Sequence, residues 1–304
     1  MTPDEQISRR QFAKRTALAA AAMTTVTTPV HSAPAPAPWK IIAFSKPFAD
    51  LSPDATADLV AEVGWDGIEC PVRTKAGHIA PERVEEDLPK MVEALKKRGK
   101  EVTIVTTEFT KLDPLAEKIL RTTAKLGIKK YRLGVTKYTK DKPIPETVRE
   151  VGAALKDLSA LNRELGIQGG WQNHSGADYV GAPLWDLWTM MKDLDPKTIG
   201  VCFDIGHATL EGGLSWPIQA RLMEPWYVAV FLKDFQWTKT AKGWQPLWCN
   251  FGDGTVQKSF LTNLKSTAFT GPLCQHHEYK DLGTGQAMIA NMKKDLAKLR
   301  EWLA

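Results

Sequence analysis

The clearest indication of the fold lies in residues 199–207, which read Ile-Gly-Val-Cys-Phe-Asp-Ile-Gly-His. A short apolar run ends in Asp204, and His207 follows three positions later, where a helical pattern begins. Polar groups at the end of a buried strand are costly unless something satisfies them. Three more apolar runs end in the same way, at Gln172-Asn173-His174, Lys233-Asp234 and His276-His277-Glu278. We therefore expect four strand ends to meet at a common site.

Strand-like and helical patterns alternate along the chain from Trp39 onward. The expected strands are residues 41–44, 67–70, 102–107, 131–133, 167–173, 199–203, 226–232 and 272–278. Repeated strand–helix units with mostly apolar strands indicate a parallel sheet, and eight of them indicate a closed (β/α)₈ TIM barrel of the α/β class. No Gly-x-Gly-x-x-Gly turn follows the first strand, which disfavours a dinucleotide-binding fold. In such barrels the chemistry lies at the carboxyl ends of the strands, where the four clusters fall.

The amino terminus is predicted to be a leader rather than part of the fold. Residues 8–14, Ser-Arg-Arg-Gln-Phe-Ala-Lys, resemble a twin-arginine export signal, and a mildly apolar stretch and small residues follow. We expect a signal peptide over residues 1–32, an Ala/Pro spacer over 33–38 and a single barrel domain over 39–304. The alternative is a disordered basic tail with an Ala-rich helix. The first interpretation predicts export by the twin-arginine machinery to the periplasm or beyond, with no membrane attachment after cleavage.

Charge and cysteine content narrow the possible functions. The formal net charge is +5, and the leader contributes four basic and two acidic residues, so its removal leaves +3. Without a dense Lys/Arg stripe, nucleic-acid binding is unsupported. The four cysteines show no metal-type spacing, and we expect free, mostly buried thiols.

Side chains two positions apart on a strand share a face, so the predicted barrel mouth can be assembled from the sequence. Inward-facing positions would be Gln172, His174, Asp204, Lys233, His276 and Glu278, and Glu69 and Glu108 could join them. Such a mixed set of nitrogen and oxygen ligands suits one divalent ion, Mn²⁺, Zn²⁺, Co²⁺ or Mg²⁺. The plainer alternative is that these groups cap strand ends through hydrogen bonds.

Taken together, the motifs resemble the xylose isomerase-like TIM-barrel superfamily of sugar phosphate isomerases and epimerases. The resemblance rests on the order of Gly64-Trp65-Asp66-Gly67-Ile68-Glu69, Gln172-Asn173-His174-Ser175-Gly176, Phe203-Asp204-Ile205-Gly206-His207, Leu232-Lys233-Asp234, Phe251-Gly252-Asp253-Gly254 and Glu278-Tyr279. It covers essentially the whole chain after the leader.

The resemblance implies one divalent ion, held by Glu on strand five, Asp on six, His on seven and Glu on eight. Asp204 and Glu278 match this pattern, whereas Gln172 replaces the first Glu and Phe231 replaces the His. His276 or His174 could compensate, so the expected metal ligands are Gln172, Asp204, His276 and Glu278. The competing interpretation is that the metal has been lost.

Because Gln172 cannot ionise, a two-base epimerisation is harder to reconcile with this sequence than a one-base β-elimination or hydration at a keto-sugar. The expected catalytic residues are Glu69, His174, His207 and Lys233, and the expected substrate-binding residues are Glu108, Asn173, Trp237 and Trp248. Residues 236–255 are expected to form a substrate-covering loop.

The sequence therefore predicts a metal-assisted isomerase, epimerase or lyase that acts on a small, non-phosphorylated sugar or keto-glycoside through an enediolate-type intermediate. The alternative is an exported carbohydrate-binding protein on a catalytically degenerate barrel. Phosphodiester cleavage is disfavoured by the weak charge and by a total of six histidines.

Overall fold

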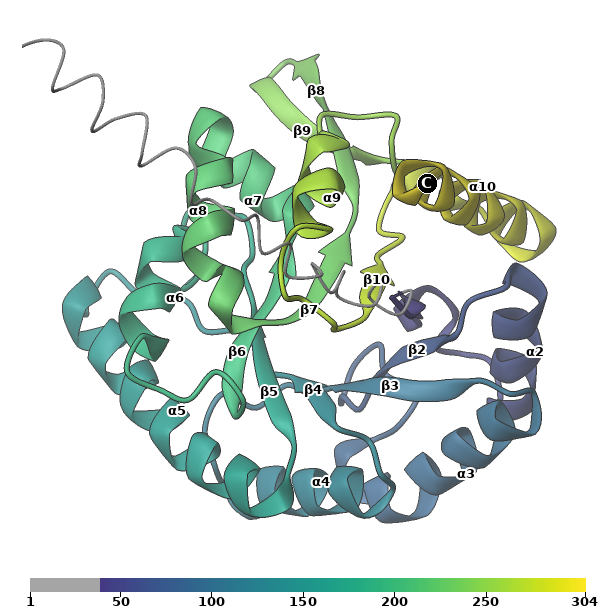
Figure 1. Cartoon of the computed structure of the whole chain (residues 1–304), viewed down its shortest axis with the longest axis horizontal. Coiled ribbons are helices and arrows are strands. Elements are labelled where there is room, and N and C mark those ends of the chain that lie inside the picture. Colours follow the sequence, from purple (N-terminus) through teal and green to yellow (C-terminus); the bar gives the residue numbers. More distant parts are fainter. Residues whose placement is uncertain (1–38) are drawn as a thin grey trace, which may run out of the picture. The chain divides into compact units, whose positions relative to one another are not determined.

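A closed barrel of eight parallel strands forms the centre of the computed structural model (Figure 1). Its strands are β1 (Ile41–Phe44), β2 (Gly67–Pro71), β3 (Glu101–Thr106), β4 (Lys130–Arg132), β5 (Gln168–Gln172), β6 (Ile199–Asp204), β7 (Tyr227–Leu232) and β10 (Leu273–Gln275). Each strand pairs with its neighbour in sequence order, and β10 closes the barrel against β1. The predicted TIM barrel is confirmed.

The structure describes residues 39–304. The predicted signal peptide and the Ala/Pro spacer lie outside the described residues, so both stay predictions. Within residues 39–304, no helix is long and apolar enough to cross a membrane.

Helices surround the barrel, as Figure 1 shows. They are α2 (Pro53–Val63), α3 (Val84–Lys97), α4 (Pro114–Lys125), α5 (Ile144–Leu165), α6 (Leu184–Met191), α7 (Ile205–Gly212), α8 (Trp216–Met223), α9 (Ser259–Leu264) and α10 (Gly285–Leu303), with short 3-10 turns η1 (Lys46–Phe48), η2 (Pro81–Arg83), η3 (Gly213–Ser215), η4 (Glu224–Trp226) and η5 (Lys280–Leu282). Two of them begin with a capping side chain followed by proline: Ser52 accepts from the Ala55 amide, and Asp113 from the Ala116 amide.

The expected covering loop is instead mainly a β-hairpin. Strands β8 (Asp234–Thr240) and β9 (Gly243–Cys249) pair in antiparallel register and project from the carboxyl side of β7 (Figure 1). The carboxylate of Asp234 accepts hydrogen bonds from the backbone amides of Gly252, Gly254 and Val256, at 2.9–3.1 Å. This buried carboxylate fixes the turn that leads from the hairpin back to α9.

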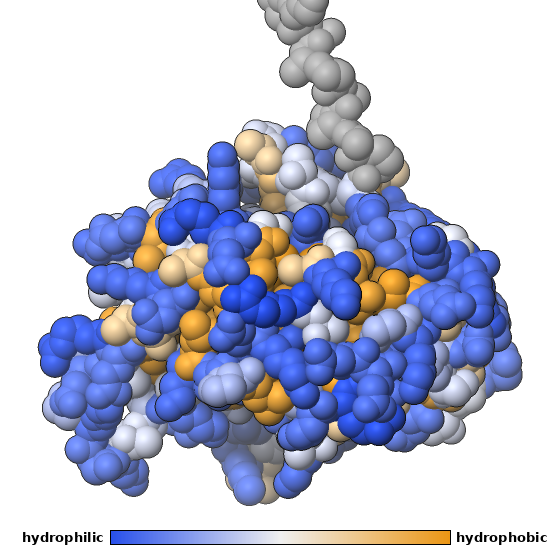
Figure 2. Space-filling model, turned by 90° about the horizontal axis from the view of Figure 1, so that it is seen from below, coloured by the Kyte–Doolittle hydropathy of each residue, from blue (hydrophilic) through white to orange (hydrophobic). Residues whose placement is uncertain are grey.

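Apolar side chains form two cores. The larger core lies between the strands and the helices, and the smaller one fills the barrel with Ile42, Phe44, Ile104, Cys202, Val228, Ala229, Phe231 and Cys274. All four cysteines are free, and three of them are buried, as predicted. On the face seen in Figure 2, polar residues cover most of the surface and apolar residues show between them.

Candidate active site

The inner surface of the barrel changes from apolar to charged toward the carboxyl ends of the strands. Seven polar side chains on six strands or their extensions gather there: Glu69, Arg132, Gln172, Asp204, Lys233, His276 and Glu278. All except Glu278 are buried, and the Glu278 side chain is 28% exposed. Because alternating strand residues face the interior, the inward face inferred from the sequence was correct.

Glu69 lies at the bottom of this group and is completely buried. Its carboxylate accepts hydrogen bonds from the Thr106 hydroxyl, from Cys274 Sγ at 3.2 Å and from His276 Nε2 at 2.9 Å, and it pairs with Arg132 Nε at 3.0 Å. Burial works to raise the pKa of Glu69, but Arg132 and His276 outweigh it and hold the pKa at about 2. A carboxylate with this many partners is an anchor, so the expected role of Glu69 as a base does not fit its place.

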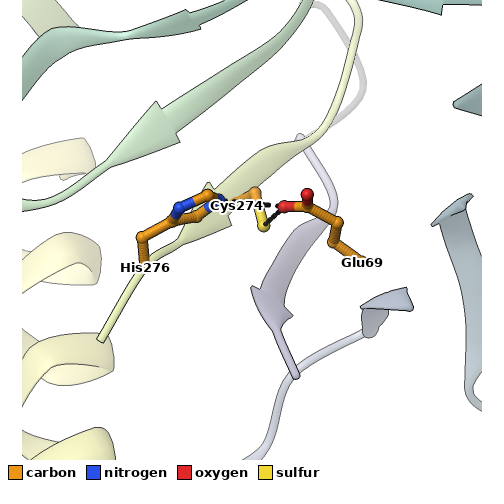
Figure 3. Close-up of side chains that lie close together, drawn as sticks. All are labelled: Glu69, Cys274 and His276. Atoms are coloured by element: carbon orange, nitrogen blue, oxygen red, sulfur yellow. Dashed lines mark hydrogen bonds and ion pairs between the residues drawn. The ribbon is translucent and has the colours of Figure 1, made fainter. Parts of the chain in front are cut away.

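Figure 3 shows how Glu69, Cys274 and His276 converge. Within residues 39–304, this is the one group of three such side chains whose ligand atoms lie within 4.8 Å of one another. The second carboxylate oxygen of Glu69 faces the guanidinium of Arg132, so a divalent ion here would lie beside a fixed positive charge. Thr106, Cys274 and His276 satisfy the carboxylate without an ion.

Arg132 is the main site residue that the sequence reasoning missed. Its guanidinium lies over the rings of Phe44 and Phe231, 4.7 and 5.6 Å from their centroids, and donates to Gln172 Oε1. The signal was present, because Arg132 lies within an expected apolar strand, between Tyr131 and Leu133. Counting charges inside strands as well as at their ends would have found it.

Gln172 and Asn173 both contact Asp204, but in different directions. Gln172 Nε2 donates to Asp204 Oδ2 at 2.8 Å inside the mouth. Asn173 is bound to the backbone of Asp204, accepting from its amide at 2.7 Å and donating to its carbonyl at 2.9 Å. Asn173 is buried and links β5 to β6, so its expected contact with substrate does not fit this position.

Lys233 lies between two carboxylates. Its Nζ is 2.8 Å from Glu278 Oε2 and 3.4 Å from Asp204 Oδ2, and the Lys233 side chain is 3% exposed. Burial works to lower the pKa of Lys233, but the charges of Asp204 and Glu278 outweigh it and raise the pKa. Lys233 in turn holds the pKa of Glu278 well below its ordinary value. The ammonium and both carboxylates are therefore charged at neutral pH.

Two histidines lie beside this ion-paired group. The rings of His174 and His207 are 4.2 Å apart between centroids, and the ring of His174 also stacks on that of Tyr179 at 4.6 Å. Burial, with Lys233 as the second cause, lowers the pKa of both imidazoles. Both rings are therefore neutral at pH 7, the form in which an imidazole can accept a proton.

Helix α7 brings His207 back to the mouth. Asp204 is its N-cap, and Oδ1 accepts from the His207 amide at 3.0 Å, so the chain turns at once after β6. The amide and hydroxyl of Ser175 lie 3.1 and 2.7 Å from His207 Nδ1. These donors place the ring proton on Nε2, which is buried and has no hydrogen-bond partner within residues 39–304.

Two adjoining cavities form the open part of the mouth. One, of about 310 Å³, is lined by residues that include Lys46, Arg73, Glu108, Arg132, Gln172 and His174. The other, of about 530 Å³, is lined by residues that include His174, His207, Lys233, Trp248 and Tyr279. Both contain Lys46, His174 and Glu278, so His174 lies where the two halves meet.

Of the expected substrate-binding residues, Glu108 and Trp248 line these cavities. Glu108 also accepts from the amide and hydroxyl of Thr74, at 3.1 and 2.5 Å. The ring of Trp248 lies 4.6 Å from Lys233 Nζ. Trp237 lies farther out on the hairpin, 49% exposed, and lines neither half of the mouth.

The four residues expected to bind a metal do not fit a divalent ion in this arrangement. Gln172 Oε1 accepts from Arg132, and His276 Nε2 contacts Glu69 below the mouth. The carboxylates of Asp204 and Glu278 face the ammonium of Lys233. A divalent ion would have to displace a buried cation.

Comparison with known proteins gives the evolutionary setting. The sequence model of a family described as "Xylose isomerase-like TIM barrel" matches residues 57–303. No curated protein matches the chain significantly.

Similar solved structures share the barrel. A 3-keto-D-glucoside 4-epimerase from E. coli has 17% identity and a TM-score of 0.66, covering 87% of this chain and 100% of its own. A xylose isomerase domain protein from Planctomyces limnophilus has 18% identity and a TM-score of 0.63, covering 87% and 96%. A xylose isomerase-like TIM barrel protein from Mycobacterium smegmatis, in complex with magnesium, has 15% identity and a TM-score of 0.64, covering 88% and 98%.

Proposed function

Because the chain belongs to the xylose isomerase-like TIM barrel family, we propose that it is an enzyme acting on a small, non-phosphorylated carbohydrate that carries a ketone. The proposed reaction is an elimination at a keto-glycoside that needs one base. In a second step, water adds to the double bond that the elimination forms. The observation that carries this proposal is a neutral imidazole, His174, at the junction of both mouth cavities and close to buried cations.

His174 is the proposed base. Its Nδ1 lies 3.4 Å from the Ser175 carbonyl oxygen, which favours a proton on Nδ1 and a free lone pair on Nε2. Stacking on Tyr179 and a tilted contact with the His207 ring fix the plane of the His174 ring. His207 carries its proton on the buried Nε2, 3.8 Å from Asp204 Oδ2, so its role is to hold the His174 ring.

Cationic side chains are proposed to stabilise the negative oxygen that forms when the ketone becomes an enolate. Lys233 supplies an ammonium on the His207 side of the mouth, and Arg73 and Arg132 supply guanidinium groups on the other side. Fixed charges in a partly dehydrated cavity stabilise such an oxygen better than water does, because they need no reorganisation.

For a 3-keto-glycoside, the proposed elimination begins when His174 removes the C2 proton next to the ketone. The electrons of the C–H bond form a C2=C3 double bond and place the negative charge on the C3 oxygen, which gives the enolate. When the C3 carbonyl forms again, the C1=C2 double bond forms and the C1–O bond to the aglycone breaks. The aglycone leaves as an alkoxide and takes up a proton. Adding water across C1=C2 would then complete a net hydrolysis without any redox change.

A two-base epimerisation is less compatible with this site. It needs a second base opposite the first, and Gln172 cannot ionise. Asp204 and Glu278 are carboxylates, but both are paired with Lys233. One base is sufficient for elimination.

The enzymatic proposal can be tested with p-nitrophenyl 3-keto-β-glucoside. We expect release of p-nitrophenol, and we expect His174→Gln to lower kcat by roughly 10²- to 10⁴-fold, the usual contribution of a general base. Lys293→Ala, an exposed residue that lines neither cavity, should leave the rate unchanged. Tight binding of several keto-glycosides with neither turnover nor exchange of the C2 proton in D₂O would instead support the carbohydrate-binding alternative.

We also propose that the protein is exported to the periplasm or beyond, on the strength of the twin-arginine pattern in residues 8–14. Fractionation of the producing cells and sequencing of the mature amino terminus test this. A cytoplasmic protein that retains Met1 would overturn it.

A further inference from the structure

We propose that the ammonium of Lys233 occupies the functional place of the divalent ion that the resemblance implies, so that this barrel carries a built-in cation. Four residues together take the place of the metal site in this proposal: Lys233, Gln172, Arg132 and Phe231. It concerns the same site as the proposed function, but it can be tested without substrate.

Lys233 places its positive charge between two carboxylates. Asp204 and Glu278 are the two residues that match the family's ligand pattern, and Lys233 Nζ lies between them, at 3.4 and 2.8 Å. The Asp204 side chain is fully buried. Two carboxylates this close to each other need a cation, and the lysine supplies it from within the chain.

Gln172 links Asp204 to Arg132. Its Nε2 donates to Asp204 Oδ2 at 2.8 Å, and its Oε1 accepts from Arg132. A glutamate here would place an oxygen against Asp204 Oδ2 with no proton between them, a repulsive contact unless a further cation joined. The amide removes one negative charge from the mouth and bridges an anion to a cation.

Phe231 packs beside His276 and Arg132. It lies two positions before Lys233, on the same inward face, and its ring packs 4.4 Å from the ring of His276 and 5.6 Å from the Arg132 guanidinium. A phenyl ring tolerates a neighbouring guanidinium through its π-face. An imidazole at this place would be a poor ligand, because Arg132 would compete with the metal for the same space.

The negative charges of Asp204 and Glu278 are therefore balanced without an added ion. Lys233 and Lys46 both pair with Glu278, and Lys233 also pairs with Asp204. Adding a divalent ion while Lys233 stays in place would put two uncompensated positive charges in a dehydrated mouth. Metal binding should consequently require removal of the lysine.

The test measures metal binding to the full-length protein. The wild-type protein is dialysed against Mn²⁺, Zn²⁺, Co²⁺ or Mg²⁺, and free ion is then removed. We expect elemental analysis to find less than about 0.1 equivalent of metal per protein. The triple variant Gln172→Glu/Phe231→His/Lys233→Met should bind about one equivalent of Mn²⁺, at least ~100-fold more tightly than wild type. Stoichiometric metal in wild type that is lost in Asp204→Asn would overturn the proposal.

A second measurement covers the case in which the triple variant does not fold. Lys233→Met alone should lower the Tm, and millimolar Mn²⁺ should restore part of the loss, because the ion replaces the missing charge. Lys46→Met is the matched control, since Lys46 also contacts Glu278 but its side chain is 43% exposed. An equal effect of Mn²⁺ on all three proteins, wild type included, would refute the idea. Because no sugar is involved, failure of the carbohydrate proposal would leave these results unaffected.

Discussion

Arg132 and Glu69 set the lower boundary of the mouth, and their pairing shows how a charge can be kept inside a barrel. Arg132 is bonded on one side to a carboxylate and rests on two aromatic rings, so its charge is compensated without water. Such pairs add little net stability relative to apolar residues, but losing one partner is costly. Their role here is to form a fixed lower boundary beneath the reacting groups.

This pairing predicts the outcome of a double-mutant cycle. Glu69→Gln and Arg132→Met should each reduce the free energy of unfolding by roughly 3–5 kcal/mol, because each leaves a buried charge without its partner. The double variant should lose much less than the sum. Urea unfolding of all four proteins measures the coupling, and Lys40–Glu101, an exposed pair at 2.6 Å, provides a control with little coupling. Additive losses in the first pair would contradict this account.

Asp295, on α10, offers a second prediction, away from the mouth. Its carboxylate accepts from Asn250 Nδ2 at 2.8 Å, the Phe251 amide at 3.2 Å and the Tyr279 hydroxyl at 2.9 Å. Burial nevertheless raises its pKa from 3.8 to about 6. His277 lies 3.6 Å away, but burial lowers the pKa of this imidazole to about 3, so it stays neutral.

A raised carboxyl pKa means that the native state holds its proton where the unfolded state has lost it. The stability due to Asp295 is therefore present below pH 4 and is lost as the pH rises to 6. We expect Asp295→Asn to be more stable than wild type at pH 7, by up to about 3 kcal/mol for a shift of this size. The difference in unfolding free energy, measured by urea titration at pH 4, 5, 6 and 7, should grow with pH. A difference that is constant from pH 4 to 7 would disprove the assignment.

The strands were predicted well, because a strand buried on both faces is a continuous apolar run. Residues 199–203 and 227–232 illustrate this, and the side-chain alternation that follows from a strand also gave Asp204 and Lys233 their inward direction. The last strand was overestimated: β10 covers only Leu273–Gln275, although His276 and Glu278 keep the inward direction beyond it.

The hairpin was not predicted, because its pattern is that of an exposed sheet. Trp237, Trp244 and Leu247 are exposed on β8 and β9, so no buried face gave the alternation a direction. Tertiary contacts escape sequence reasoning for a similar reason. The pairing of Arg132 with Glu69 joins residues from β4 and β2, and no local pattern relates those two positions.

The hairpin depends on Asp234, which accepts three backbone amides of the return turn. Asp234→Ala should reduce the free energy of unfolding by roughly 2–4 kcal/mol, since buried amides lose their acceptor. It should also raise KM more than it lowers kcat, because Trp248 on β9 lines the mouth while His174 stays in place. Gly254→Ala is the matched variant, as a Cβ there would collide with the Asp234 side chain and the Phe235 carbonyl. Unchanged KM and stability in both variants would rule out this role of the turn.

The whole chain combines a predicted export signal with four unpaired thiols, although exported proteins meet an oxidising environment. Cys70, Cys202 and Cys274 are buried in the barrel strands, and burial raises the pKa of each, to about 12 for Cys70. A thiol kept protonated and out of solvent is unreactive. A protein that crosses the membrane already folded would keep these thiols protected throughout.

The number of accessible thiols can be counted with a thiol reagent. We expect the native protein to react at no more than one thiol, slowly, at the partly exposed Cys249, whose pKa burial also raises to about 12. In guanidinium chloride without reductant all four thiols should react, and Cys249→Ser should abolish the native reaction while leaving three in the denatured state. Fewer than four in the denatured wild type would reveal a disulfide, and two or more in the native protein would show that the barrel opens. Either result would contradict the claim that burial in the folded barrel protects the thiols, because only an intact barrel keeps three of them away from the solvent.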